Sequence, residues 1–346
     1  DPMSGGIINP ISTYPYPDFK PERTKSYEVG INARFLNGRI SFDGTFYQSN
    51  TYNQTFLSVM SPATGYSGFY VQAGNVRNRG VEMTLGYNDT FGKVNYSTHL
   101  TYTANQNKIV EMVHDYRNPI DNSLVNITEL TLKEAGDVYL REGYSMSDVF
   151  TTGILQRGRD GKLVEEGNGY QVDRSQRIRL GSADPDFTMG WRHDINYKNI
   201  SLGLMITGRF GGIVTSQTQA FMDAFGVSKV SAEARDNGGV MLDGHRYDAE
   251  RYYNTVGGQG LMSYYTYDAT NVRLQELSLT YSLPKKWLGD VFNNATISFV
   301  GRNLFMFYRK APFDPDMNGS TGTYNRSDFF MAPSLRNLGF SIKFSL

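Results

Sequence analysis

The residue types that most often perform chemistry are sparse in this sequence, and their spacing is not that of a catalytic or zinc-type site. The sequence has no cysteine, which excludes disulfide bonds and thiolate metal ligands. No G-x-S-x-G motif marks a serine nucleophile. None of the 4 histidines has metal-ligand spacing to another; they are His99, His114, His193 and His245. The sequence therefore favours a protein that is not an enzyme.

One segment does have the spacing of a metal-binding loop. In DPDMNGSTGTYN (314–325), Asp314, Asp316 and Asn318 occupy positions that calcium loops use for oxygen ligands. The last position of such a loop normally holds a bidentate Glu, and here it is Asn325. Ca²⁺ is therefore a weak candidate ligand, a plain turn is the alternative, and no other cofactor is indicated.

Two tyrosine-rich runs are the better candidates for binding. Four tyrosines of the runs RYYNTV (251–256) and MSYYTY (262–267) are the candidates: Tyr252, Tyr253, Tyr264 and Tyr265. Aromatic faces pack well on sugar rings and on peptide side chains, so these residues do not decide between the two substrates. The formal net charge is +0, which gives no overall field that would attract nucleic acid.

A two-residue alternation of apolar and polar side chains predicts the elements that position these residues. In YEVGINARF (27–35), Val29 and Ile31 share one face while Glu28 and Arg34 lie on the other, and an Asn-Gly hairpin signal follows. The same alternation recurs along the chain, which gives about nine strands in all. The further segments are 40–47, 80–87, 94–105, 187–197, 200–210, 272–283, 295–307 and 335–346.

The lengths of the connections between these strands also alternate. Short turns are expected at 37–38, 89–92, 198–199 and 284–293. Long connections are expected at 56–68, 107–185, 211–265 and 309–334. All short connections then fall at one end of the strands and all long ones at the other, as in outer-membrane barrels with periplasmic turns and extracellular loops. No continuous apolar segment approaches the length that a transmembrane helix needs.

The two faces of the predicted strands differ in a way that suits a membrane. The polar face is rich in Ser, Thr, Asn and Gly, and aromatic residues such as Tyr87, Tyr102 and Tyr197 gather near strand ends, as in interfacial girdles. A soluble all-β protein with its polar face in water remains the alternative. In a barrel, Ile31, Leu85, Leu204 and Phe340 would face hydrocarbon.

The charged residues of the polar face would then face the barrel lumen. They either contact substrate or pair with one another and with a plug. The residues in question are Glu28, Arg34, Asp43, Glu82, Arg192, Asp194, Arg209, Glu276 and Arg302. His193 falls on the apolar face, so either the strand has a local bulge or this position faces a neighbour.

Several blocks in order resemble the C-terminal half of TonB-dependent outer-membrane transporters, and within these the SusC/RagA branch of Bacteroidetes-type bacteria. The blocks are 20–47, NVRNRGVEMTLGY (75–87), PDFTMGW (185–191), NVRLQELSLTYSLPKKWL (271–288), GRNLFMFYRKAPFDPDM (301–317) and the last strand. The resemblance implies an all-β fold in which residues 1–346 form the C-terminal portion of an antiparallel transmembrane β-barrel of ~22 strands. The plug domain and the N-terminal strands would then be absent from this chain.

The resemblance also implies a function and partners. The expected function is active import of glycans or peptides across the outer membrane, with the loops 107–185 and 211–265 contacting substrate. The expected partners are the N-terminal part of the same transporter, a SusD-like surface lipoprotein, TonB acting through the plug, and membrane lipid or lipopolysaccharide. A passive porin or structural barrel and a soluble extracellular glycan-binding β-protein are the alternatives.

Overall fold

The computed structural model describes residues 13–14, 19–59, 66–117, 122–132, 138–289, 292–316 and 327–345. These residues pack as two compact units. The first unit contains residues 1–28, 47–80 and 106–150, and the second contains residues 29–46, 81–105 and 151–346. Four long strands contribute residues to both units, so each unit is described in turn.

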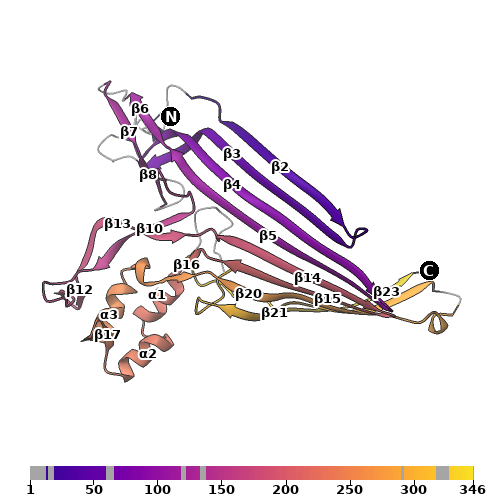
Figure 1. The fold of residues 1–346 in the computed structure, drawn as a ribbon. Helices are drawn as coiled ribbons and strands as arrows, with labels where there is room; N and C mark the ends of the chain where they lie inside the picture. The colour runs from indigo at the N-terminus through magenta and orange to yellow at the C-terminus, as the bar shows by residue number, and fades with distance from the viewer. Residues whose placement is uncertain are drawn as a thin grey trace, which may run out of the picture. The chain divides into compact units, whose positions relative to one another are not determined.

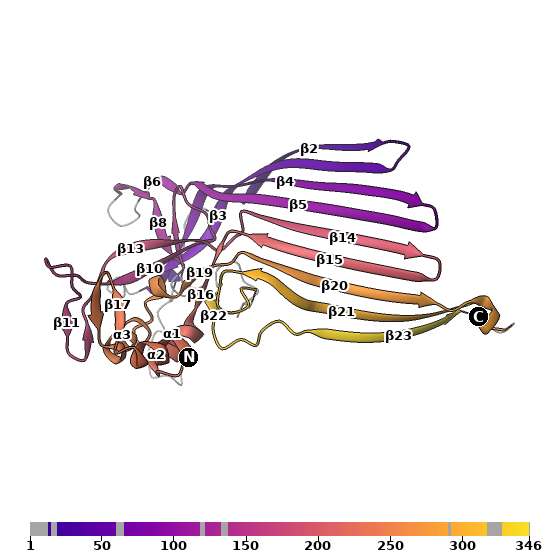
Figure 2. The same cartoon turned by 60° about the horizontal axis from the view of Figure 1, so that its bottom comes forward.

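The second unit is built on one antiparallel sheet, whose strands lie side by side in Figures 1 and 2. Along the sheet the order is β2, β3, β4, β5, β14, β15, β20, β21 and β23, with neighbours in sequence mostly neighbours in space. The strand bounds are β2 Arg23–Phe35, β3 Ile40–Val59, β4 Gly68–Phe91, β5 Val94–Glu111, β14 Phe187–Tyr197, β15 Ile200–Phe210, β20 Asn271–Ser282, β21 Asn294–Arg309 and β23 Asn337–Ser345. Each segment predicted from the alternation lies within one of these strands or overlaps it, so the predicted strands are confirmed.

Three strands are much longer than their alternation indicated. The segments 40–47, 80–87 and 94–105 are parts of β3, β4 and β5, whose additional residues belong to the first unit. These extensions carry amides on facing strands, such as Asn50, which donates to Asn75 at 2.8 Å. Strand segments outside hydrocarbon need no apolar face, so alternation does not reveal them.

The first unit adds short strands to these extensions. They are β1 Thr13–Tyr14, β6 Val113–Arg117, β7 Leu124–Ile127, β8 Glu129–Thr131 and β9 Tyr139–Arg141. Ile109, Met112 and Leu140 are among its fully buried side chains. The rings of Tyr139 and Tyr144 meet Phe150 edge to face, with centroids 5.0 and 5.6 Å away.

The predicted long connections also contain secondary structure, which the alternation did not indicate. Their further elements are β10 Asp148–Leu155, β11 Glu165–Glu166, β12 Gly169–Tyr170, β13 Val172–Ser182, β16 Ile213–Ser216, α1 Gln217–Ala224, α2 Lys229–Asp236, β17 Val240–Leu242, β18 His245–Tyr247, α3 Ala249–Val256, η2 Met262–Tyr264, β19 Thr266–Asp268 and β22 Ser327–Asp328. The predicted short connection 284–293 contains η3 Lys285–Trp287. Figure 2 shows the three α-helices gathered beside β17 at one end of β14 and β15.

Polar N-caps and a small apolar core hold this helical region together. The side chains of Ser216, Ser228 and Asp248 each accept a hydrogen bond from a backbone N–H in the first turn of α1, α2 and α3. Val256 and Leu261 are almost completely buried in the core beneath them. Such short helices are not stable alone, so burial of this core fixes them.

The apolar faces of the sheet strands are exposed, as a membrane-facing surface requires. Ile31, Leu85 and Phe340 are 63%, 48% and 68% exposed, and Leu204 is only partly buried. The other face is polar at the same level, where Ser41 and His99 crowd the position of Gly86. Among the described residues, no helix is long and apolar enough to cross a membrane. The predicted division into a lipid face and a lumen face therefore agrees with the structure.

A β-bulge shifts the pairing of β20 with both of its neighbours. On β20, Glu276 pairs with Met205 but Leu274 pairs with Ile206, so Gln275 is skipped. On β21 the pairing passes from Arg302 to Phe305. An extra residue exchanges the two faces of a strand beyond the bulge. Leu274 therefore joins Ile206 on the apolar face, and the residue before it turns to the lumen.

Arginine substitutions on the two faces of β4 should have unequal effects. A Leu85→Arg substitution places a charge on the lipid face and should destabilise the barrel by about 2 kcal/mol or more. A Thr84→Arg substitution on the lumen face is the matched control and should cost much less. Denaturant unfolding of the full transporter in lipid vesicles measures both. Equal losses would contradict the assignment of the faces.

Candidate functional site

Four of the predicted lumen charges, Arg192, Asp194, Glu276 and Arg302, form a connected chain across the sheet. Arg192 Nε lies 2.8 Å from Asp194 Oδ2, and Arg192 Nη1 lies 3.7 Å from Glu276 Oε1. Arg302 Nε lies 3.1 Å from the other carboxylate oxygen of Glu276. The interpretation that these charges pair with one another is the one that the geometry supports. Because the side chains remain partly exposed, each pair is worth less than about 1 kcal/mol.

A glycine on the intervening strand makes room for this chain of charges. Arg192 is on β14 and Glu276 on β20, and both pair with Met205 of the intervening strand β15. Gly203, two residues before Met205 on the same face of β15, pairs with Asp194 and Ser278. A Cβ atom at position 203 would lie 3.3 Å from Asp194 Oδ1 and 3.6 Å from Arg192 Nη2. The missing side chain therefore lets the guanidinium reach across a whole strand.

Arg209, another of the lumen candidates, belongs to a different cluster centred on Arg273. The Arg273 side chain is only 6% exposed, and its Nη2 lies 2.9 Å from Asp314 Oδ1 and 2.6 Å from Asp316 Oδ2. Arg209 Nη1 lies 3.9 Å from Asp316, and its Nη2 donates to the carbonyl of Ala183. The bulge in β20 turns Arg273 into this cluster, which the sequence analysis missed.

Hydrogen bonds stabilise the ionised form of Asp314. Burial alone would raise its pKa, but donation from the Ser334 backbone, the Asp316 backbone and Arg273 holds the pKa of Asp314 below its usual value. This carboxylate therefore stays charged throughout the neutral range.

The arginine contacts bear on the calcium hypothesis. Asp314 and Asp316, two of its three candidates, already bind the guanidinium of Arg273. Asn318 lies outside the described residues. Within the part of the chain that the structure describes, no group of three or more His, Cys, Asp or Glu side chains is placed to hold a metal ion. Calcium binding stays an untested prediction.

The four predicted tyrosines come together around one cavity. We call it the tyrosine pocket; its volume is about 490 Å³, and its polar lining includes Asp223, Tyr252, Tyr253, Tyr264, Tyr265, Tyr267 and Lys310. Tyr252 meets Tyr253 edge to face with ring centroids 5.2 Å apart, and Tyr264 at 6.5 Å. Helix α3 supplies Tyr252 and Tyr253, η2 supplies Tyr264, and Tyr265 follows η2 directly.

The environment of Tyr252, Tyr265 and Tyr267 keeps their hydroxyl groups protonated. Burial raises the pKa of Tyr267 to about 12, and the negative charge of Asp223 adds to the effect. Burial raises the pKa of Tyr252 and Tyr265 further, again with a contribution from Asp223. The pocket therefore presents neutral hydroxyl donors and aromatic faces.

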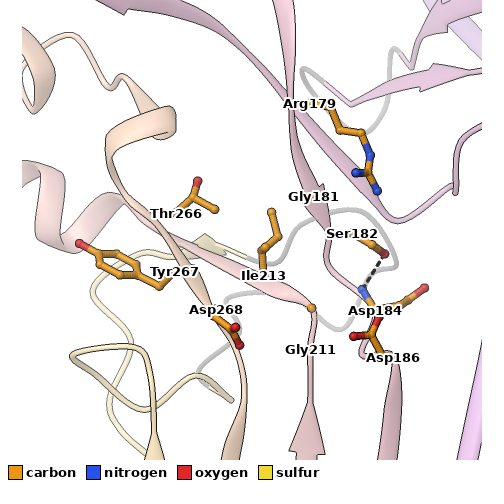
Figure 3. A pocket seen from close by; sticks show the side chains of 11 residues that line it. Arg179, Gly181, Ser182, Asp184, Asp186, Gly211, Ile213, Thr266, Tyr267 and Asp268 are labelled. Atoms are coloured by element: carbon orange, nitrogen blue, oxygen red, sulfur yellow. Dashed lines mark hydrogen bonds between the residues drawn. The ribbon is translucent and has the colours of Figure 1, made fainter.

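A second cavity lies on the other side of Tyr267, which lines both. It encloses about 440 Å³ and brings together Asp184, Asp186 and Asp268 (Figure 3). Gly211, between β15 and β16, borders this cavity; its φ of +74° favours glycine, and a Cβ there would clash with Asp186 Oδ2.

The carboxylates of this second cavity are partly neutralised. Asp268 binds Lys310 Nζ at 2.6 Å. Although burial raises the pKa of Asp268, hydrogen bonds from Lys310 and Thr270 lower it overall. The sequence analysis missed these carboxylates. The run SADPDF (182–187), with its acidic residues directly before a strand, is the signal that was available for two of them.

The structure also accounts for His193 on the apolar face. The pairing of β14 with β15 shows no register shift, so His193 does not sit at a bulge. Its Nδ1 lies 2.7 Å from Tyr96 Oη, and the two rings stack with centroids 6.0 Å apart. Trp191 Nε1 donates to Thr98 Oγ1 at 3.0 Å beside them. His193 therefore faces a neighbour, Tyr96, which is the second of the two alternatives.

Comparisons with known proteins agree with this architecture. The family model described as "TonB dependent receptor-like, beta-barrel" matches residues 2–207. The chain is 25% identical to TonB-dependent receptor P3 of Formosa agariphila over 369 residues, covering 99% of this chain and 36% of that protein. It is 25% identical over 321 residues to receptor P26 of the same organism, covering 87% of this chain and 32% of P26. The chain thus spans about a third of the length of these relatives.

A solved structure shares the fold. The RagAB peptide importer in its open-open state superposes with a TM-score of 0.66 at 18% identity, covering 97% of this chain and 36% of that one. At this identity the likeness establishes the fold alone.

The buried arginine should matter more for stability than an exposed one. An Arg273→Met substitution leaves Asp314 nearly buried without its cation, and should reduce the free energy of unfolding by about 3–5 kcal/mol. An Arg302→Met substitution removes a partner that is 64% exposed and should cost less than about 1 kcal/mol. Denaturant unfolding compares the two, and a similar loss in both variants would contradict this account.

The same cluster predicts a pH dependence. Because folding lowers the pKa of Asp314, its contribution to stability is present above the unfolded value of about 3.9 and is lost as pH falls through the lower folded value. Asp314→Asn should therefore lose less stability than the wild type on acidification below about pH 4. Unfolding midpoints measured across this range test the slope, and parallel curves for the two proteins would refute it.

Proposed function

Because the chain belongs to the family of TonB-dependent receptor-like β-barrels, we propose that it forms part of the wall of an outer-membrane importer of the SusC/RagA type. The cargo is an oligomeric nutrient, a glycan or a peptide, that passes through the lumen. We propose that residues 1–346 are the C-terminal part of the barrel. The rest of the protein carries the remaining strands and the plug that TonB moves.

One observation carries the proposal: the sheet has an exposed apolar face opposite a face with a hydrated chain of charges. Phe340 and Leu85 are bare on the first face, while Arg192, Glu276 and Arg302 line the second. A soluble extracellular β-protein would bury the apolar face in a core. In a barrel wall in the outer membrane, the apolar face contacts lipid and the charged face lines the lumen.

The folded connections support a role in substrate capture. Unlike the short turns that close the opposite strand ends, these segments form a helical subregion with the tyrosine pocket. Cavities with aromatic walls and a few polar groups are typical of small-molecule and oligomer sites. A SusD-like surface lipoprotein is the proposed partner at this end, and lipid or lipopolysaccharide surrounds the wall. The proposal assigns no covalent chemistry to the chain.

Energy coupling separates an active importer from a passive porin. Cells that express the full transporter with its lipoprotein take up a fluorescent oligosaccharide or a fluorescent peptide, and uptake should stop when a protonophore collapses the inner-membrane potential. Deletion of the TonB-binding segment of the full protein should have the same effect. Uptake that continues in both cases would identify a passive porin instead.

Parallel measurements with the two probes assign the substrate class. The structurally similar RagAB is a peptide importer, which favours a peptide as the substrate. The tyrosine faces suit either probe. Growth on each compound as sole nutrient provides an independent readout.

A further inference from the structure

Asp223 is a buried carboxylate without a cationic partner among the described residues. It lines the tyrosine pocket and is only 4% exposed. Its Oδ1 accepts hydrogen bonds from Gln219 Nε2 at 2.8 Å and from the hydroxyl of Ser228, both neutral donors. Every ion pair found in the described residues joins other groups. A buried charge normally has a partner of opposite sign, because desolvation is otherwise uncompensated.

The position of Asp223 in its helix adds to this imbalance. It lies in the last turn of α1 (Gln217–Ala224), and the backbone N–H of Phe225 caps the carbonyls of Phe221 and Asp223. The C-terminal end of a helix carries partial negative charge, which favours cations and disfavours carboxylates. The carboxylate therefore occupies a place where its own helix does not stabilise it.

The walls of the pocket are suited to a cation. The rings of Tyr252, Tyr253 and Tyr264 line it, and the faces of aromatic rings attract positive charge. The Tyr265 hydroxyl is shielded from solvent and interacts with Asp223, although without a hydrogen bond of normal geometry. Tyr265 is itself 3% exposed. This hydroxyl is a neutral group, so it does not balance the charge of Asp223.

The one basic residue of the pocket does not neutralise Asp223. Lys310 Nζ lies 2.6 Å from Asp268, with which it forms an ion pair at the boundary of the second cavity. Once this pair is set aside, the negative charge of Asp223 remains in excess. One positively charged group in the pocket would therefore balance the charge of Asp223.

We propose that the tyrosine pocket binds a positively charged group of the transported substrate, an ammonium or a guanidinium, against Asp223 and the tyrosine faces. The identification of the ligand as cargo depends on the import function proposed above, but the cation preference follows from the pocket itself. A cavity of about 490 Å³ accommodates a lysine or arginine side chain or one amino-sugar unit. The same ammonium chemistry thus has two possible sources, a peptide and a deacetylated glycan.

Matched probes test the preference and identify its source. The peptide pair is Ala-Ala-Lys-Ala-Ala, blocked at both ends, and the same peptide with acetyllysine. The saccharide pair is the glucosamine tetramer and its fully N-acetylated counterpart. Calorimetric titration of the full transporter should show, for at least one pair, that the free amine binds about tenfold or more tightly. The pair that shows this difference names the substrate class.

Two charge-removing variants complete the design. Asp223→Asn should abolish the preference for the free amine, whereas Asp236→Asn, which removes an exposed carboxylate of α2, should preserve it. The proposal is overturned if acetylated and free probes bind equally to the wild type, if none of the four binds at millimolar concentration, or if Asp223→Asn retains the preference. The wild-type comparison stands even if Asp223→Asn does not fold. Potential-dependent uptake of the acetylated probes as readily as the free amines would reject the cation inference while leaving the import function intact.

Discussion

The constraint on which this structure depends is that a strand in hydrocarbon must satisfy every backbone N–H and C=O group through its neighbours. The antiparallel ladder from β2 to β23 provides these partners between neighbouring strands, and its register is continuous between β14 and β15 and shifts only locally at the bulge of β20 with its two neighbours. Because the backbone is satisfied by the ladder, side chains are free to differ on the two faces. The outer face is then apolar and the inner face charged, and both properties follow from one pairing pattern.

On the inner face, each charged side chain is either partly exposed to solvent or paired with a charge of opposite sign. The partly exposed ion pairs join Arg192, Glu276 and Arg302. These charges make the lumen polar at little cost in stability. Arg273 is nearly buried, and two carboxylates and two amides surround it. Polar groups on the outer face are paired as well, as the Tyr96–His193 contact illustrates. In each place, the more deeply a charged or polar group is buried, the more completely its hydrogen bonds and charge are balanced by partners.

The connections at the other strand end use different means to become rigid. In a small sheet, β19, β16 and β22 join segments that are far apart in the sequence. Ser216 donates to Asp328 at 2.7 Å within it, and the buried cap residue thereby ties α1 to the chain that precedes β23. This support fixes the helices that carry Asp223, Tyr252 and Tyr253. The tyrosine pocket is therefore a preformed cavity on a braced subregion, which limits the entropy lost when a ligand binds.

The sequence by itself determined the strands, their faces and the pattern of short and long connections, because a strand in contact with lipid must repeat every two residues. It also pointed to the tyrosine runs, whose four candidates the structure brings to one cavity. The two-residue alternation did not predict the strand extensions or the helical subregion, because segments outside the hydrocarbon need no continuous apolar face. Only the tertiary structure placed Arg273 in the lumen, because one skipped residue at Gln275 reverses the faces of β20. Only the tertiary structure brought Asp223 to the tyrosines, because contacts between separate helices and strands leave no periodic trace in the chain.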